Sequence, residues 1–310
     1  MVAGMQTATQ PGFSGEQWTI AADGHEAIVV EVGGGIREYA SHGVAHLDGY
    51  GPHEVCPSSA GQVLAPWPNR IRDGRYPFAG RSHQLGLTEA ARRNAMHGLV
   101  RWVRWRLVER TAEAVTVEHD LVPQPGYPWQ LRLRTTWTVG ADGLRAVHEA
   151  TNVGTQECPF GLATHPYLRL PQVAVDDVEL RVPARSQLLT DARNLPVALR
   201  RVDGGEHDFS QARRIGAAQL DMTFGDLIPD DDGFSRVTLA GGDRRLTVWA
   251  GPEFRWWQIF TGDTLGPVRQ RRSVAVEPMT CPPDAFRSGR DLVVLAPGQT
   301  WRGSWGINPS

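Results

Sequence analysis

The chain has 310 residues, of which 41% are hydrophobic and 21% charged, and its formal net charge at pH 7 is −2. This composition is typical of a folded protein that buries a large core, and it excludes disordered and fibrous classes. Because the charges nearly balance, a nucleic-acid or anionic-membrane surface would need strong local clustering of arginines, so we expect neither partner.

Apolar and polar residues alternate with a period of two through most of the chain, which predicts β-strands joined by turns rich in Gly, Pro, Asp and Asn. In 130–139, Leu131, Leu133, Thr135, Trp137 and Val139 face one way and the intervening residues face water. Nine strands are predicted, in chain order, at 26–32, 103–109, 114–121, 130–139, 144–152, 236–239, 245–250, 256–261 and 273–277. A short turn of helix near 210–218 is the only helix expected.

Strands at this spacing without intervening helices predict an all-β fold, a large antiparallel β-sandwich. No linker and no internal repeat divides the sequence. We therefore expect one domain at 17–308 behind a flexible N-terminal tail at 1–16. The N-terminus is polar and no run of about 18 apolar residues occurs, so the expected location is cytoplasmic.

The basic residues are all arginine, and the absence of lysine excludes Schiff-base and pyridoxal-phosphate chemistry and the lysine-dependent phosphate loop. Cys56, Cys158 and Cys281 show no CxxC spacing and are interpreted as free thiols. No two of the ten histidines are separated by a single residue, which argues against a His-x-His metal site on a strand. We expect neither metal nor cofactor.

His165 and Glu277 each directly precede a proline. A residue before proline is pushed into extended backbone geometry, so the direction of its side chain is well fixed. An imidazole and a carboxylate held in this way suit an acid and a base. Each residue also has a simpler interpretation, His165 as a hydrogen-bonded core histidine and Glu277 as a surface carboxylate at the end of a strand.

An ordered series of short motifs resembles the aldose 1-epimerase (galactose mutarotase) family from about Gly33 to Gly298. The series, in chain order, is Pro66-Trp67-Pro68-Asn69-Arg70-Ile71-Arg72-Asp73-Gly74-Arg75-Tyr76, Asn94-Ala95-Met96-His97-Gly98, Gly126-Tyr127-Pro128, Thr164-His165-Pro166-Tyr167, Leu220-Asp221, Gln258-Ile259-Phe260-Thr261-Gly262 and Val276-Glu277-Pro278. The His-Pro-Tyr-Leu form at 165–168 is similar to a bacterial subgroup. The resemblance implies a β-sandwich isomerase, an aldose 1-epimerase that interconverts the α and β anomers of a free aldose.

The resemblance also implies a role for eight residues. Glu277 resembles the general base that takes the proton from the 1-hydroxyl of the sugar, and His165 the acid that protonates the ring oxygen. His97 resembles a second histidine near that oxygen. Five positions match residues that hold sugar hydroxyls: Asn69, Arg70, Tyr167, Asp221 and Gln258.

Three alternatives remain open at this stage. A hexose-6-phosphate 1-epimerase of the same fold would use an arginine-rich loop such as 269–272, which carries Arg269, Arg271 and Arg272. A glycoside hydrolase would use two carboxylates, with Asp221 as the partner of Glu277. A non-catalytic carbohydrate-binding protein would present the same polar residues without turnover. In each case the partner is a small-molecule sugar, and we expect a monomer or a homodimer.

Overall fold

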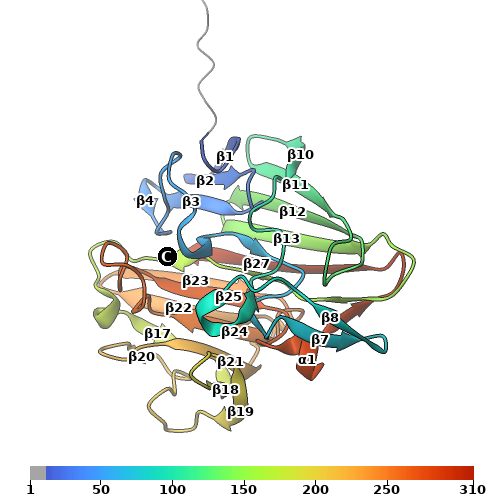
Figure 1. Cartoon of the computed structure of the whole chain (residues 1–310). Helices are drawn as coiled ribbons and strands as arrows, with labels where there is room; N and C mark the ends of the chain where they lie inside the picture. Colours follow the sequence, from blue (N-terminus) through green and yellow to red (C-terminus); the bar gives the residue numbers. More distant parts are fainter. Residues whose placement is uncertain (1–11) are drawn as a thin grey trace, which may run out of the picture.

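The computed structural model describes residues 12–310, and strands make up nearly all of its regular structure. The strands form two large sheets and several smaller ones, with antiparallel pairing throughout the described ranges (Figure 1). This arrangement confirms the predicted all-β antiparallel sandwich. The first eleven residues of the expected tail lie outside the described residues; within 12–16, the Phe13 amide donates to the Pro52 carbonyl at 2.9 Å.

The first large sheet contains nine strands. In spatial order they are β10 (Arg106–Arg110), β11 (Ala114–Leu121), β12 (Leu131–Gly140), β13 (Gly143–Asn152), β27 (Thr300–Pro309), β23 (Arg244–Ala250), β22 (Ser235–Gly241), β17 (Glu179–Arg181) and β20 (Arg213–Arg214). In β12 the residues predicted to face inward are buried, whereas Arg132 is exposed and Arg134 partly exposed. The alternation in sequence therefore marks the core face and the solvent face of this sheet correctly.

The second large sheet contains eight strands and carries the site described below. In spatial order they are β19 (Pro196–Arg201), β18 (Ala184–Thr190), β21 (Asp221–Leu227), β24 (Trp256–Phe260), β25 (Val274–Met279), β15 (Ala163–Thr164) and β5 (Val63–Leu64), with β16 (Tyr167–Leu168) also paired to β25. At the N-terminal end a four-stranded sheet contains β1 (Gln17–Ala22), β2 (His25–Val30), β3 (Ile36–Ser41) and β4 (Val44–Ala45).

Short elements complete the fold. Three two-stranded sheets pair β6 (Arg70–Arg72) with β9 (Asn94–Met96), β7 (Arg75–Phe78) with β8 (Arg81–Gln84), and β14 (Cys158–Phe160) with β26 (Val293–Leu295). The helical elements are α1 (Ala285–Ser288) and the 3₁₀ turns Pro57–Ser59, Ala90–Arg92 and Val175–Asp177. Within residues 12–310 no helix is both long and apolar enough to cross a membrane.

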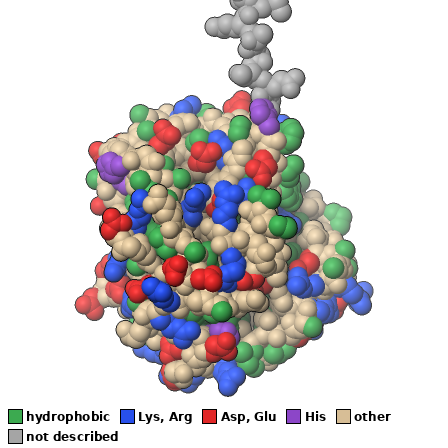
Figure 2. Space-filling view, turned by 90° about the vertical axis from the view of Figure 1, so that its left-hand side faces the viewer, with side chains coloured by type: hydrophobic (Ala, Val, Ile, Leu, Met, Phe, Trp, Pro, Cys, Tyr) green, Lys and Arg blue, Asp and Glu red, His purple; other side chains and the backbone are tan. Residues whose placement is uncertain are grey.

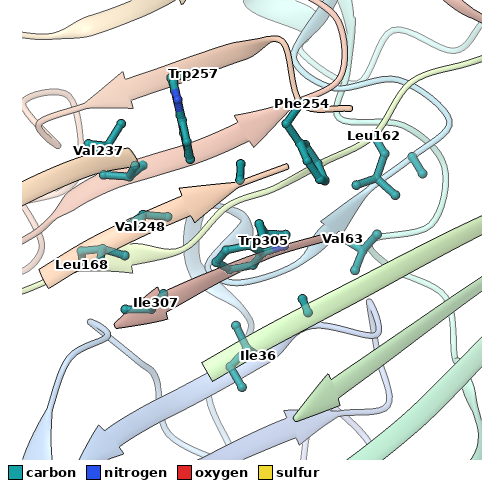
Figure 3. Close-up of a cluster of buried hydrophobic side chains, with 14 of the residues drawn as sticks. Ile36, Val63, Leu162, Leu168, Val237, Val248, Phe254, Trp257, Trp305 and Ile307 are labelled. Carbon is teal, nitrogen blue, oxygen red and sulfur yellow. The ribbon is translucent and has the colours of Figure 1, made fainter. Parts of the chain in front are cut away.

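The two large sheets share one hydrophobic core. Trp257 of the eight-stranded sheet and Val248, Trp305 and Ile307 of the nine-stranded sheet belong to the same buried cluster (Figure 3). A buried aromatic or aliphatic side chain of this size stabilises the fold by about 1.5–3 kcal/mol relative to exposure. Because one face of the eight-stranded sheet packs into this core, the other face of β21, β24 and β25 can present polar groups.

Each of the nine predicted strands overlaps an observed one, although several strands had no prediction, among them β18, β21 and β27. The predicted helical turn near 210–218 is wrong. Arg213 and Arg214 instead form β20, because their backbone extends the edge of the nine-stranded sheet by pairing with Leu180 and Glu179 of β17.

The three cysteines are free, as predicted, and all three are buried. On the face shown in Figure 2, arginine and acidic side chains are interspersed and no large area of one sign forms.

Candidate active site

A cavity of about 880 Å³ lies against the core-distal face of the eight-stranded sheet. This volume is within the range typical of small-molecule sites. The eight residues with implied roles all line it: Asn69, Arg70, His97, His165, Tyr167, Asp221, Gln258 and Glu277. The fold therefore brings together side chains that are spread over more than 200 positions of sequence.

Two parts of the chain build the cavity walls. One wall is a single stretch, 58–101, which contributes Ser58, Ser59, Asn69, Arg70, Glu89, Arg92, Met96, His97 and Arg101. The facing wall comes largely from strands β18, β21, β24 and β25 of the sheet and from the segment around His165. The two walls therefore differ in how they are held. The strand residues are fixed by backbone pairing, whereas the 58–101 wall is mostly connecting chain.

Across the sheet, Thr223, Gln258 and Glu277 form a row on strands β21, β24 and β25. Gln258 is paired directly with both Thr223 and Glu277, and directly paired residues of antiparallel strands share a face. Asp221 lies two residues before Thr223 and so shares that face. The Gln258 amide donates to Asp221 Oδ1 at 2.7 Å and accepts from the Thr223 hydroxyl. These two hydrogen bonds fix the orientation of the Gln258 amide.

His165 lies between β15 and β16, at a strand end as its position before Pro166 predicts. Its Nε2 is 3.3 Å from Glu277 Oε1, and its ring stacks on Tyr167 with centroids 4.7 Å apart. Glu277 is only 2% exposed and lies inside β25, since the strand continues through Pro278 to Met279. The interpretation of Glu277 as a surface carboxylate at a strand end is therefore wrong.

The wall opposite the sheet places His97 and Asn69 in the left-handed backbone region, with φ of 59° and 52°. The His97 amide donates to the Asn69 carbonyl at 2.8 Å, which ties the two segments together. Gly98 is required here because a Cβ at this position would lie 2.0 Å from the Ala65 carbonyl oxygen. The result is a His97 ring edge-on to His165, with centroids 5.6 Å apart.

Arg70 is held by a carboxylate that has no implied role. Glu89 accepts from Arg70 Nε at 2.9 Å and from Nη2 at 3.0 Å, a bidentate pair that fixes the guanidinium plane. Glu89 is in turn held by the Asn94 amide at 2.8 Å. Arg70 Nη1 donates to Asn69 Oδ1 at 3.3 Å, so the two predicted hydroxyl-binding side chains are positioned together.

Burial governs the protonation of the site. It raises the pKa of Glu277 well above its usual value, with the nearby Asp221 charge adding to the rise and Arg70 opposing it. Burial also lowers the pKa of His165, and that of His97 well below the ordinary value; the charge of Arg101 adds to both. Burial therefore disfavours the charged form of each group, and their 3.3 Å separation allows a proton to pass between them.

Several buried polar atoms of the cavity have no hydrogen-bond partner among residues 12–310: Glu277 Oε2, His165 Nδ1 and His97 Nδ1. Buried polar groups in proteins are almost always paired, so atoms of this kind at a cavity wall are suited to a polar ligand. Over the same residues, no group of three or more His, Cys, Asp or Glu side chains is arranged to hold a metal ion.

Among the cavity residues and supports without a sequence prediction are Thr223, Glu89, Arg101 and Asn194. Thr223 could have been found, because it lies two positions after Asp221 on a strand and must share its face. Asn194 donates to Asp221 Oδ2 at 2.8 Å from a loop 27 residues away. Glu89 and Arg101 carry no local signal, since only the folded chain brings them to the cavity.

The arginines at 269–272 are already paired. Arg269 binds Asp48 and Glu54, Arg271 binds Asp176 and Asp263, and Arg272 binds Asp48. None of the three lines the cavity.

The antiparallel β-sandwich is the fold of solved galactose mutarotase-like proteins. The family model described as aldose 1-epimerase matches residues 16–307. The chain therefore belongs to the aldose 1-epimerase family.

A relative similar in sequence and two proteins similar in structure support the assignment. The uncharacterised protein YihR of Escherichia coli strain K12 is 34% identical over 290 residues, which cover 93% of this chain and 92% of that protein. A GalM/aldose epimerase homologue from C. elegans superposes with a TM-score of 0.85 at 17% identity, covering 95% of this chain and 98% of the other. The galactose 1-epimerase of Lactobacillus acidophilus gives a TM-score of 0.80 at 20% identity, with 95% and 94% covered. At these identities the two structures establish the fold.

Proposed function

We propose that the protein is an aldose 1-epimerase, an isomerase that interconverts the α and β anomers of a free aldose by acid/base-catalysed ring opening. The observation that carries the proposal is the 3.3 Å approach of His165 Nε2 to Glu277 Oε1 inside a sugar-sized cavity. Family membership and the name of the Lactobacillus galactose 1-epimerase support the same reaction.

In this mechanism the carboxylate form of Glu277 removes the proton from O1 of the cyclic sugar while the imidazolium form of His165 protonates the ring oxygen O5. The C1–O5 bond then breaks and leaves an open-chain aldehyde. Rotation about C1–C2 exposes the other face of the aldehyde, and closure returns both protons with the roles reversed. His97, beside His165, assists at the ring oxygen. Ring opening leaves Glu277 protonated and His165 neutral, which are the forms that burial favours, and closure restores the carboxylate and the imidazolium.

The sugar hydroxyls are assigned to the remaining predicted residues. Arg70 donates from a plane fixed by Glu89, and Asp221 accepts hydroxyl protons beside the oriented Gln258 amide. Asn69 and the Tyr167 hydroxyl, which donates to Ser58 O at 3.3 Å, complete the contacts. Groups held by partners of their own lose little side-chain entropy when substrate binds, which favours affinity.

We further propose that the protein acts in the cytoplasm on a small-molecule sugar, as a monomer or homodimer, and requires neither cofactor nor metal. Three buried free thiols are typical of a reducing compartment.

The test is equilibration of a pure anomer followed by polarimetry across a panel of aldoses, against the spontaneous rate. Catalysed equilibration that falls by about 10²–10⁴ in His165→Asn supports the proposal. Sugar binding without any acceleration would instead identify a carbohydrate-binding protein. Release of nitrophenol from aryl glycosides would identify a glycoside hydrolase.

A further inference from the structure

Three arginines line the cavity, and they differ in how their charge is balanced. Arg70 and Arg92 both donate to Glu89, at 2.9 Å and 3.0 Å. Arg101 donates from Nη1 to the neutral Ser59 hydroxyl at 3.1 Å, and in the described part of the chain no carboxylate oxygen lies within 4.0 Å of its guanidinium. Arg101 is thus a half-buried cation in the cavity wall without an acidic partner.

The position of Arg101 is fixed by contacts on both sides. Its carbonyl accepts from the Gln62 amide at 2.5 Å. Ser59, which holds the guanidinium, belongs to the turn Pro57–Ser59, and Ser58 of that turn accepts from Tyr167, the ring that stacks on His165. Arg101 therefore lies on the histidine side of the cavity.

We propose that Arg101 binds an oxyanion carried by the sugar substrate, so that the preferred substrate is an aldose with an anionic group on the C5 side of its ring. This inference rests on the proposed function, because it places the ring oxygen at His165 and hence C5 and its substituent near Arg101. A guanidinium matches the fork geometry of carboxylate and other oxyanions, and Arg101 has no internal anion to compete with them.

A comparison with Arg70 explains why a neutral hydroxyl is the poorer partner. Arg70 has a bidentate carboxylate partner in Glu89 and therefore suits neutral hydroxyls. Burial of Arg101 has no such compensation and lowers its pKa, so binding an anion recovers electrostatic free energy that a hydroxyl cannot supply.

An anion at this position also helps the chemistry. The positive charge of Arg101 contributes to the lowered pKa of both His97 and His165. An oxyanion beside Arg101 offsets that charge, which raises the pKa of His165 and favours the imidazolium needed to protonate the ring oxygen. An anionic substrate therefore favours the protonated form of His165 that its own ring opening requires.

The first experiment measures kcat/KM for glucose, glucuronate and glucose 6-phosphate with wild type, Arg101→Gln and Arg101→Lys. We expect Arg101→Gln to lower kcat/KM for the anionic sugars relative to glucose by about ten- to hundredfold, the usual value of a charge-assisted hydrogen bond. Arg101→Lys, which keeps the charge, should recover part of this ratio. Arg92→Gln is the matched control, because it removes an equal charge from a cavity arginine that has an acidic partner, Glu89.

The second experiment measures binding of inorganic sulfate and phosphate by calorimetry, with chloride at equal ionic strength as the reference. Binding by wild type that is lost in Arg101→Gln and kept in Arg92→Gln supports the proposal. Equal binding by wild type and Arg101→Gln, or an equal loss of activity on glucose and on both anionic sugars, would overturn it. If no aldose is equilibrated at all, the proposed function fails, and the anion-binding result alone decides the role of Arg101.

Discussion

Replacing Glu277 with Gln is expected to remove most of the activity and, at the same time, to stabilise the fold. The amide is nearly isosteric with the carboxyl group but cannot accept the O1 proton. General acid/base groups contribute about 10²–10⁴ in rate, so kcat should fall by that factor while KM changes much less.

The gain in stability follows from burial. Glu277 is 2% exposed, and Oε2 has no hydrogen-bond partner among residues 12–310. The neutral amide has no charged form whose burial opposes folding, so the replacement should recover on the order of 1 kcal/mol at neutral pH, or about 2 °C in Tm.

The pH dependence has a defined sign. Because burial raises the pKa of Glu277 in the folded state, its ionisation opposes folding. The penalty is absent below the unfolded pKa of about 4.3 and grows as pH rises towards the folded pKa. The Tm difference between Glu277→Gln and wild type should therefore be largest at neutral to alkaline pH and vanish in acid.

Two assays on the same preparations suffice: anomer equilibration by polarimetry, and thermal unfolding at several pH values. Glu253→Gln, at an exposed position, is the matched control and should change neither. Full activity in Glu277→Gln would exclude Glu277 as the base. A Tm that falls at neutral pH would refute the argument from burial even if activity were lost.

Three further outcomes are expected. Glu89→Gln should raise KM for aldoses roughly tenfold, because Arg70 loses its bidentate anchor, and an unchanged KM would show that Arg70 needs none. Exhaustive chelation should leave kcat unaltered, and activity lost and then restored by a divalent ion would contradict a metal-free mechanism. Residues 17–308, proposed as one domain, should unfold in a single calorimetric transition with equal van't Hoff and calorimetric enthalpies, whereas two resolved transitions would indicate separate domains.

The sequence was most informative where a strand has one face in water. In β12 the alternation identifies the buried residues one by one, because solvent and core select opposite side chains. Strand β25 is buried on both faces, so it shows no alternation, and its continuation past Pro278 could not be predicted. Strands β5 and β15 have two residues each, too few to show any period.

For the candidate site, the sequence motifs identified the residues that carry chemistry but not those that support them. His165 and Glu277 were found by their positions before proline and by family resemblance. Glu89 lies 19 residues after Arg70, and it holds the Arg70 guanidinium through a bidentate geometry that no local sequence pattern encodes. The missing counter-charge of Arg101 is likewise visible only in three dimensions.

The origin of the two cavity walls has an evolutionary consequence. Glu277 is paired into the middle of a sheet, and changes around it would disturb the core beneath. The facing wall is encoded by one contiguous stretch, 58–101, most of it outside the large sheets. Substitutions at Asn69, Arg70 or Arg101 of that stretch can therefore change contacts to the sugar without disturbing the core beneath Glu277.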